Sequence, residues 1–365
     1  MTAPRTTVWE IDAHTPAKHN VLREYLKAWF PIMSRVGLRL VFVDGFAGPG
    51  VYSKGEPGSP VIAMETYRES YLYLAPNFRS TGNVVFLFVE KDQDRVASLK
   101  ELIQRAPKLP GKVEVDVVTG DFATAMQNVL ATIPTGRRMA PAFVMVDPFG
   151  VKDYPLDVLT KLLGGGKVEL YISFMYEWID RFKSTEEFAA ILTPLYGTDE
   201  WRKALDLTGD AKRDFLLGLY ENQLRKAGAK HVLRFDLHRK GRNVYSLFFA
   251  TQHEKGSDVM KKAMWNVAPF GDFAFHGRRD PQLAFGAPPP DVTPLRDALL
   301  AEFNGKWTTI EDVAAFVSSD RTDFHTGHLK KPLLIPMERA GRIEVDPKSR
   351  KATWGFPDGT RFRFR

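Results

Sequence analysis

The residues best suited to chemistry form a glycine-rich turn that follows an apolar run beginning at Leu38. From Asp44 to Gly50 the chain reads Asp-Gly-Phe-Ala-Gly-Pro-Gly. Glycines let the backbone approach a ligand without an intervening Cβ. An acid at the end of a strand can orient a cationic amine, whereas a phosphate favours a turn that leads directly into a helix N-terminus. A tight turn without a ligand is the alternative, but the acid, the aromatic residue and the preceding strand together favour ligand binding. The predicted binding residues are Asp44, Gly45, Phe46, Ala47, Gly48 and Gly50.

Two further acids stand at the ends of later apolar runs. Glu90 ends a run that starts at Asn83, and its carboxylate is suited to accept hydrogen bonds from two ribose hydroxyls. Asp121, followed by Phe122, ends the next run and is suited to accept from an adenine amine. Acids also finish strands as solvated caps, so neither one is specific alone. Together with the glycine turn they predict a clamp on an adenosine moiety.

A second chemical segment, Asp147-Pro148-Phe149-Gly150, ends another apolar run. An exocyclic base amine is a poor nucleophile because its lone pair is delocalised into the ring. A carboxylate and a backbone carbonyl that accept its two hydrogens would favour the pyramidal nitrogen that attacks a sulfonium methyl group. An adjacent aromatic ring can stack on the base. The alternative is a strand-ending turn set by proline; the position at the strand end favours catalysis, with S-adenosylmethionine as the methyl donor.

Other residues are weaker candidates. Tyr176 and Trp178 begin a helical stretch and are candidate substrate contacts. Lys18 and His19 precede a helix with a mainly apolar face, and we expect them at the surface; a position of either one at the cofactor pocket is the alternative. Basic residues Lys348, Arg350 and Lys351 are candidate contacts to nucleic acid, with a solvated surface as the alternative. The histidines show no metal-ligand spacing, so no metal site is expected.

Composition limits the class of protein. The 365 residues are 44% hydrophobic and include no cysteine, which excludes disulfides, thiolate metal sites and cysteine nucleophiles. No apolar run is long enough to cross a membrane, and no secretion signal is recognisable, so a cytoplasmic protein is expected. The net charge is +7. From residue 348 onwards the chain has six basic residues and one acid, Asp358, so the tail contributes +5 of this net charge. A basic balance permits attraction to nucleic acid.

Short apolar runs alternate with helical segments over the first two thirds of the chain, which predicts an α/β fold with a parallel sheet. The five expected strands span 38–44, 83–90, 113–119, 142–147 and 168–174. Continuous apolar runs indicate burial on both faces. A hairpin follows, with strands 231–239 and 243–252. Five parallel strands and a terminal antiparallel hairpin are typical of the Rossmann-like class I methyltransferase sheet.

We therefore predict a first domain over residues 1–270, with a helical insertion at 176–229, then a linker over 271–290 and a small domain over 291–365. The linker contains Gly-Ala-Pro-Pro-Pro, a semi-rigid spacer. In the small domain, Thr308, Thr309 and Glu311 predict a helix cap. A third helix is expected from Phe324 towards Arg339, disturbed by two prolines, and wing strands at 343–345 and 353–356. This pattern predicts a winged-helix-like domain.

Three segments resemble the three-Cys-motif partner proteins, the TcmP family. They are the stretch from His14 to Trp29, the turn from Val43 to Gly50, and the Gly-Glu-Pro-Gly-Ser-Pro segment that starts at Gly55. The resemblance spans most of the chain. It implies a Rossmann-type methyltransferase fold, a C-terminal winged helix-turn-helix, and a radical-SAM-like protein partner that carries three cysteines.

The segment Asp147-Pro-Phe-Gly150 separately resembles the catalytic motif of tRNA guanine-N2 dimethyltransferases, and more loosely the Asp-Pro-Pro-Tyr motif of amino-methyltransferases. The resemblance implies that Asp147 holds the amine and that Phe149 stacks on the base. Relative to Asp-Pro-Pro-Tyr, the aromatic residue stands one position early.

The resulting prediction is an S-adenosylmethionine-dependent N-methyltransferase acting on an exocyclic amine of a nucleobase, in RNA ahead of DNA. Three alternatives stay open: a non-catalytic methyltransferase-like subunit of the three-Cys-motif partner, a winged-helix regulator that binds nucleic acid, and methylation of a protein side chain.

Overall fold

The computed structural model describes residues 6–12, 15–36, 39–74, 83–180, 186–239, 242–269, 274–275, 289–350 and 354–365. It divides into two compact units. The first comprises Met1–Gln252 with Phe275–Gly277, and the second His253–Ala274 with Arg278–Arg365. Helix α9 (Glu254–Val267) therefore groups with the C-terminal unit, whereas the sequence interpretation had assigned it to the first domain. Most of the predicted linker lies outside the described residues.

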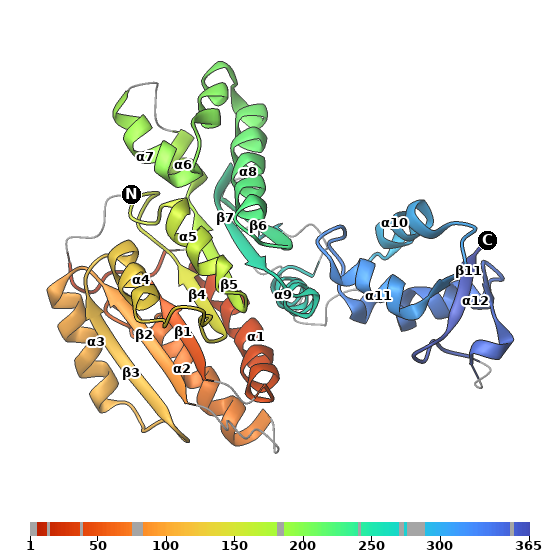
Figure 1. Ribbon diagram of the computed structural model, residues 1–365, viewed down its shortest axis with the longest axis horizontal. Helices are drawn as coiled ribbons and strands as arrows, with labels where there is room; N and C mark the ends of the chain where they lie inside the picture. The colour runs from red at the N-terminus through yellow and green to blue at the C-terminus, as the bar shows by residue number, and fades with distance from the viewer. Residues whose placement is uncertain are drawn as a thin grey trace. The chain divides into compact units, whose positions relative to one another are not determined.

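One sheet organises the first unit, with strand order β3-β2-β1-β4-β5-β7-β6-β8 (Figure 1). Strands β1 to β5 pair in parallel, and β7 pairs antiparallel with both β5 and β6. The strands are β1 (Leu40–Asp44), β2 (Val84–Glu90), β3 (Val113–Thr119), β4 (Ala142–Val146), β5 (Val168–Phe174), β6 (His231–Arg239), β7 (Arg242–Thr251) and the two-residue β8 (Ala274–Phe275). The predicted α/β class, the five parallel strands and the antiparallel hairpin are confirmed.

Burial of the strands follows their position in the sheet. Every residue of β2, β4 and β5 is buried, as the apolar runs predict. Strand β3 instead alternates between partly buried and exposed residues. Burial of β3 on both faces was therefore a wrong prediction, because the exposed acids Glu114 and Asp116 alternate with valines along this edge strand and give it one solvated face.

Helices cover both faces of the sheet. On one face α1 (Thr15–Ser34) packs beside α2 (Ser59–Glu69), which continues into a π-helical turn at Ser70–Leu74. The ring of Tyr25 in α1 contacts Phe143 and Phe249, on β4 and β7. The opposite face carries Phe174 and Phe248, which contact Tyr220 of α8 (Gly209–Lys226). The crossovers between the parallel strands also include α3 (Gln93–Arg105), α4 (Phe122–Ala131) and α5 (Leu156–Gly164).

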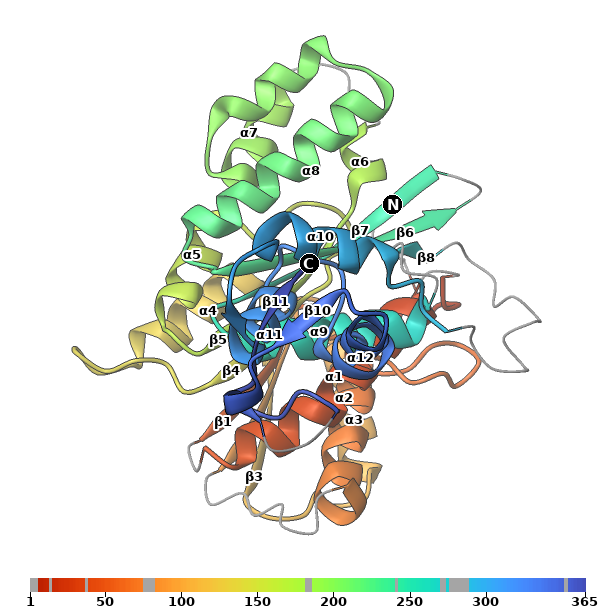
Figure 2. The ribbon, with the colours of Figure 1, turned by 90° about the vertical axis from the view of Figure 1, so that its right-hand side faces the viewer.

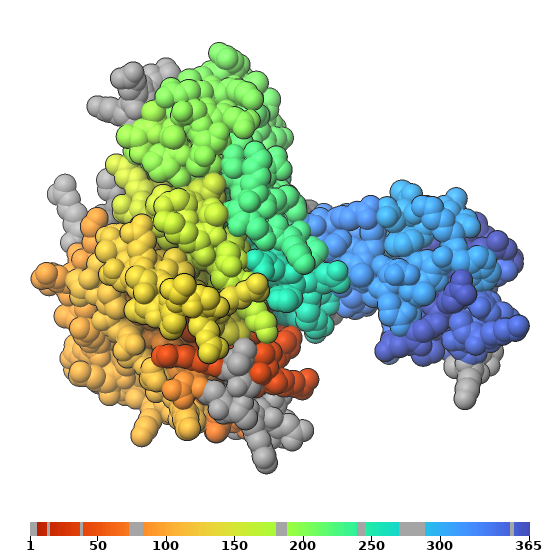
Figure 3. All heavy atoms as spheres, viewed as in Figure 1, coloured from red at the N-terminus to blue at the C-terminus, as the bar shows by residue number. Residues whose placement is uncertain are grey.

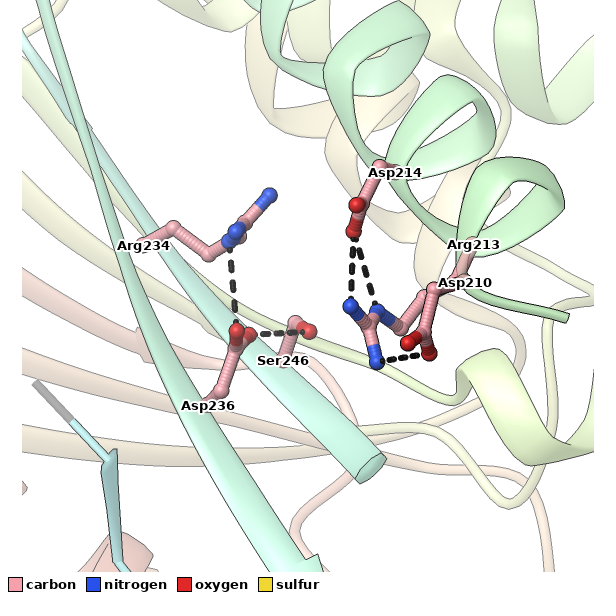
Figure 4. Close-up of polar contacts among 6 residues, drawn as sticks. All are labelled: Asp210, Arg213, Asp214, Arg234, Asp236 and Ser246. Atoms are coloured by element: carbon pink, nitrogen blue, oxygen red, sulfur yellow. Dashed lines mark hydrogen bonds and ion pairs between the residues drawn. The ribbon is translucent and has the colours of Figure 1, made fainter. Parts of the chain in front are cut away.

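The segment between β5 and β6 is helical, with α6 (Tyr176–Asp180), α7 (Glu186–Tyr196), a 3-10 helix at Asp199–Asp206 and α8. Polar side chains of α8 and of the β6–β7 hairpin lie near one another, and their contacts are drawn in Figure 4. Arg213 of α8 pairs with Asp210 at 2.8 Å and Asp214 at 2.9 Å. On the hairpin, Asp236 accepts a hydrogen bond from the hydroxyl of Ser246 at 2.6 Å. These charges are satisfied locally.

The second unit packs helices against a small antiparallel sheet of order β10-β11-β9. The atoms of its C-terminal part are blue in Figure 3. Its elements are α9, α10 (Thr293–Phe303), β9 (Thr308–Thr309), α11 (Ile310–Ser318), a 3-10 turn at Thr326–His328, a π-helical turn at Lys330–Leu334, α12 (Ile335–Arg339), β10 (Ile343–Val345), a 3-10 turn at Pro347–Ser349 and β11 (Arg361–Phe364). Strand β10 lies where it was predicted.

Two details of this unit differ from expectation. The last strand is Arg361–Phe364 and not 353–356, because the Arg-Phe-Arg-Phe alternation buries both phenylalanines while the arginines face outwards. The predicted third helix is broken, since the two prolines that interrupt it lack a backbone donor. The expected cap of α11 exists, but Asp312 rather than Glu311 closes the capping box with Thr309.

Buried polar contacts join α9 to the rest of the second unit. The ammonium of Lys261 donates to the carbonyl oxygens of Ser319 at 2.7 Å and Thr322 at 3.1 Å, and also to that of Val317. The indole of Trp265 donates to the carbonyl oxygen of Asp323 at 2.7 Å. Because a buried ammonium needs such acceptors, α9 is fixed to the end of α11.

Within the described residues, no helix has both the length and the apolar character needed to cross a bilayer.

Glu169 gives a test of this packing. It is buried in β5, where its carboxylate accepts hydrogen bonds from Tyr25 at 2.7 Å and Thr251 at 3.1 Å. Burial raises the pKa of Glu169 above its ordinary value of 4.5. Between the ordinary and the raised pKa the folded protein binds more protons than the unfolded chain, so the free energy of unfolding falls as pH rises across that window. Glu169→Gln should remove this part of the decline.

Urea unfolding of the wild type and of Glu169→Gln between pH 4.5 and pH 7 measures the effect; the lower limit is the ordinary pKa. Exposed Glu114→Gln serves as the control and should keep the wild-type slope. Parallel slopes for the wild type and Glu169→Gln would contradict the burial argument.

Candidate functional site

Among the described residues, two adjoining pockets open where β1, β2 and β4 end. The acidic pocket, of about 450 Å³, is lined by Glu90, Asp121 and Phe122 among others. The Lys18 pocket, of about 500 Å³, is lined by Lys18 and Asp147 among others. The two pockets share Phe46, Pro148 and Phe149 as a common wall. The predicted cofactor and catalytic segments therefore converge on one region.

Asp44 lies beneath this region and lines neither pocket. Its side chain is completely buried; Oδ1 accepts a hydrogen bond from the N–H of Phe46 at 3.1 Å, and Oδ2 accepts none in good geometry. Burial raises the pKa of Asp44 to about 7, against the lowering effects of the Ser59 hydroxyl and the Phe46 N–H. The charges of Asp147 and Glu90 raise it further. A buried carboxylate without a full set of donors is a site that favours a nearby cation.

Backbone hydrogen bonds hold the glycine turn between its neighbouring strands. The N–H of Gly45 donates to the carbonyl oxygen of Met145 at 2.9 Å, and that of Ala47 to Val89 at 2.9 Å. Gly48 has a φ of 61°, a conformation that glycine adopts without strain, and its N–H donates to Oε2 of Glu90 at 2.9 Å. The turn is thereby attached to the ends of both β2 and β4.

The segment after the turn folds back on it. Val51 and Pro57 form an antiparallel bridge, and the N–H of Gly58 donates to the carbonyl oxygen of Gly50 at 2.8 Å. A side chain at Gly58 would meet that oxygen at 2.9 Å, so only glycine fits. The Gly-Glu-Pro-Gly-Ser-Pro sequence therefore braces the turn, then starts α2.

The predicted cofactor residues divide between the two pockets: Ala47, Gly48 and Gly50 line the Lys18 pocket, whereas Gly45, Glu90, Asp121 and Phe122 line the acidic pocket. Glu90 is 8% exposed, and its Oε1 accepts a hydrogen bond from the N–H of Asp92 at 2.9 Å. Asp121 caps α4 by accepting from the N–H of Thr124 at 2.9 Å, which lowers its pKa. The ring of Phe122 is buried and packs against that of Phe46, with ring centroids 5.8 Å apart. Both carboxylates have further lone pairs with which to accept hydrogen bonds.

An ion pair dominates the Lys18 pocket. The ammonium of Lys18 lies 2.7 Å from each carboxylate oxygen of Asp147. It also lies 4.9 Å from the centre of the Tyr245 ring, and the hydroxyl of Tyr171 donates to the Lys18 carbonyl oxygen at 2.9 Å. Helix α1 thus contributes a cation to the end of β4.

The expected surface position of Lys18 and His19 was wrong. Both are buried, 5% and 6% exposed, because α1 lies on the sheet with its first turns facing the pocket. Burial lowers the pKa of His19 to about 3, so its ring is neutral at physiological pH. A sequence signal existed: Lys18 precedes Val21, Leu22 and Tyr25 by three, four and seven residues and so shares their apolar face.

Phe149 is 41% exposed at the common wall of the two pockets. The ring of Trp9 packs against its ring at a centroid distance of 5.3 Å, and the guanidinium of Arg95 lies 4.8 Å from the Trp9 ring. Sequence reasoning missed Trp9 because the segment around it carries no recognisable motif, and Arg95 because it lies within α3 and not at the end of a strand. Because these contacts fix the Phe149 ring while part of it stays exposed, it can stack on a flat ligand.

The predicted substrate residues lie elsewhere. Tyr176 is buried, and Trp178 lies beside Gly150, within 3.6 Å of where a Cβ of that glycine would stand. Neither lines the two pockets. His14 and Lys351 are outside the described residues.

The two described basic candidates in the second unit differ. Lys348 is exposed. Arg350 faces inwards, where it pairs with Glu338 and donates to the carbonyl oxygen of Gly355 at 2.6 Å. Its placement favours a packing role.

No protein-family model matches the chain, and no curated protein matches it. Similar solved structures include Trm1 from Pyrococcus horikoshii with S-adenosyl-L-methionine, at 13% identity and a TM-score of 0.37 over 72% of this chain and 62% of that one. Human methyltransferase-like protein 13 in complex with SAH shares 12% identity at a TM-score of 0.34, over 69% of this chain and 92% of that one. A putative methyltransferase from Porphyromonas gingivalis shares 13% identity at a TM-score of 0.27, over 62% of this chain and 40% of that one.

The chain thus spans less than two thirds of the first and third of these structures. The likenesses are distant, so the assignment of the site rests on the chain's own residues.

The glycine turn yields a paired test. Gly50 and Gly55 have φ values of 84° and 85°, but a side chain at Gly50 would meet Cδ1 of buried Leu99 at 2.8 Å, whereas nothing lies within 4 Å at Gly55. Gly55→Ala should lower the free energy of unfolding by about 1–2 kcal/mol, the cost of a left-handed alanine. Gly50→Ala should lower the free energy of unfolding by this amount and by about 1–3 kcal/mol more, because its methyl group overpacks against Leu99.

Urea denaturation of both variants beside the wild type measures the difference. Equal losses for the two alanine variants would show that the turn is not packed against α3 as described.

Proposed function

We propose that the chain is an S-adenosylmethionine-dependent methyltransferase that acts on an exocyclic amine of a nucleobase, in RNA ahead of DNA. The observation that carries the proposal is the position of Asp147. Its carboxylate ends β4 in a pocket that shares a wall with the one lined by Glu90 and Asp121. An acceptor for an amine and acceptors for an adenosine are therefore adjacent.

The residues present fit the cofactor. Glu90 would hold the ribose hydroxyls, Asp121 the adenine amine, and the glycine turn would lie along the cofactor. Beneath the turn, Oδ2 of buried Asp44 accepts no hydrogen bond in good geometry, and a cationic cofactor nearby would favour ionisation of this carboxyl. When bound, S-adenosylmethionine supplies an electrophilic methyl group on a cationic sulfonium.

Asp147 would orient the amine and take the proton that the nitrogen loses on methylation. Both carboxylate oxygens already accept from Lys18, yet a carboxylate has about four lone-pair positions and can accept from an amine as well. Lys18 is a positioning residue in this scheme, because it fixes the direction of the carboxylate. Holding the nitrogen in line for transfer supplies much of the remaining rate.

Phe149 would stack on the base. Its ring is exposed at the common wall, where Trp9 of the Lys18 pocket and Arg95 of the acidic pocket pack beside it. A flipped or unpaired base could then present its amine to Asp147.

The second unit would dock the substrate. From α10 onwards its described elements follow the order helix, strand, helix, broken helix, strand, strand, which is the order expected of a winged helix. The family resemblance adds a radical-SAM-like three-Cys-motif protein as a proposed partner. We place the protein in the cytoplasm.

Cofactor binding is the first test. Glu90→Gln should weaken binding of S-adenosylhomocysteine, measured by calorimetry, about tenfold or more, since a hydrogen bond to a charged group contributes about 1.5–3 kcal/mol. Glu114→Gln, an exposed carboxylate of β3 paired with Arg39, is the matched control and should bind as the wild type does. Failure of the wild type to bind would reject the cofactor assignment.

Methyl transfer is the second test. Asp147→Asn replaces an acceptor oxygen by a donor that opposes both Lys18 and the substrate amine. Transfer of labelled methyl groups to total RNA should fall about 100-fold, the range for loss of one transition-state contact. Binding of S-adenosylhomocysteine should persist, and the exposed control Asp157→Asn should transfer normally.

Binding of the cofactor without any transfer that depends on Asp147 would support the non-catalytic subunit instead. Transfer to a protein side chain but not to RNA would keep the enzyme and change its substrate.

A further inference from the structure

The outer face of the small sheet carries a row of arginines. Strand β11 is its central strand, and β10 and β11 lie side by side (Figure 2). Phe362 and Phe364 are buried, whereas Arg361 and Arg365 are exposed and Arg363 is partly exposed. Side chains two residues apart on a strand share a face and lie about 6.8 Å apart. The three guanidinium groups therefore form an evenly spaced row.

An exposed tryptophan flanks this row. Trp307, directly before β9, is 43% exposed, and the guanidinium of Arg363 lies 5.2 Å from its ring centre. Because this large aromatic ring is already exposed, a flat ligand can cover it at little cost, and the stacking contributes to the binding energy. Its position beside the arginine row combines a stacking surface with positive charge.

One acid opposes the row. Glu344 is the cross-strand neighbour of Arg363, and its Oε2 accepts from Arg363 at 2.8 Å and from Arg365 at 2.9 Å. No described residue forms an ion pair with Arg361. Glu344 thus holds two guanidinium groups in place while they remain partly accessible, and a ligand phosphate would compete with it.

We propose that this arginine face, formed by Trp307, Glu344, Arg361, Arg363 and Arg365, binds a single strand of nucleic acid. The phosphates contact the guanidinium groups, which match phosphate geometry bidentately, and one base stacks on Trp307. The need for an unstacked base selects a single strand over a duplex. The choice of nucleic acid as ligand rests on the proposed function; the surface itself does not.

Fluorescence anisotropy with the full chain and a labelled single-stranded RNA of about 12 nucleotides tests the proposal, because such platforms span about 4–16 nucleotides. The double variant Arg361→Gln with Arg365→Gln should bind about tenfold more weakly at low salt. Its slope of log affinity against log salt should be smaller by about 1.4, since each phosphate contact on a single strand contributes about 0.7. The double variant Arg39→Gln with Arg105→Gln, at two exposed arginines of the first unit, controls for net charge.

Glu344→Gln separates docking from a merely structural ion pair. Docking predicts about threefold tighter binding, because both arginines are released from their counter-charge; a structural pair predicts no gain. Trp307→Ala should weaken binding, and Trp307→Phe should restore most of it. Thermal unfolding of each variant checks that the sheet remains folded.

Wild-type affinity in the double arginine variant, weaker binding by Glu344→Gln, or equal binding of an RNA duplex or of polyglutamate would each overturn the proposal. Binding is measured without cofactor. A chain that binds RNA but transfers no methyl group would therefore reject the proposed activity alone, and one that transfers without using the arginine face would reject this inference alone.

Discussion

The ion pair between Lys18 and Asp147 is the interaction on which the arrangement of the site depends. Removing two charges from water costs several kcal/mol per ion unless each finds a close partner. Here Lys18, 5% exposed, lies 2.7 Å from both oxygens of Asp147. Because neither group can be left alone in this environment, the first turn of α1 must lie at the end of β4. The wall of the Lys18 pocket follows from that requirement. Tyr245 lines the pocket beside the Lys18 ammonium, and the hydroxyl of Tyr171 donates to the backbone carbonyl oxygen of Lys18.

The sheet topology explains why the pockets form at this place. Strand order reverses between β1 and β4, since the chain runs outwards to β3 and then returns to the other side of β1. Connections leave these two strands in opposite directions, and in open α/β sheets the crevice between them is where ligands bind. The glycine turn follows one of these strands and Asp147 the other. The N–H of Gly45 donates to the carbonyl oxygen of Met145 and so closes the bottom of the crevice.

Local pattern and non-local contact explain what the sequence could and could not predict. The buried strands, the hairpin and the positions of Glu90 and Asp147 at strand ends follow from apolar runs and their terminal residues, which are local. The pairing of Lys18 with Asp147 joins residues 129 positions apart, and no short-range pattern contains it. The last strand was misplaced although its Arg-Phe alternation has the period of a half-buried strand, because the arginines were interpreted only as tail charge. The helix cap was placed correctly, but two neighbouring acids could close it and only the backbone geometry selects Asp312.

The charges around the crevice also discriminate between cofactors. Asp44 is buried and has a pKa raised to about 7, partly by the neighbouring charges of Asp147 and Glu90. An anionic dinucleotide would add to this repulsion and would favour the neutral acid. A cofactor with a sulfonium and an ammonium group would instead stabilise the ionised form, so that cation binding and loss of the Asp44 proton support each other. Since Lys18 pairs with Asp147, Asp44 is the buried acid near the glycine turn whose ionisation would respond most to a cationic cofactor.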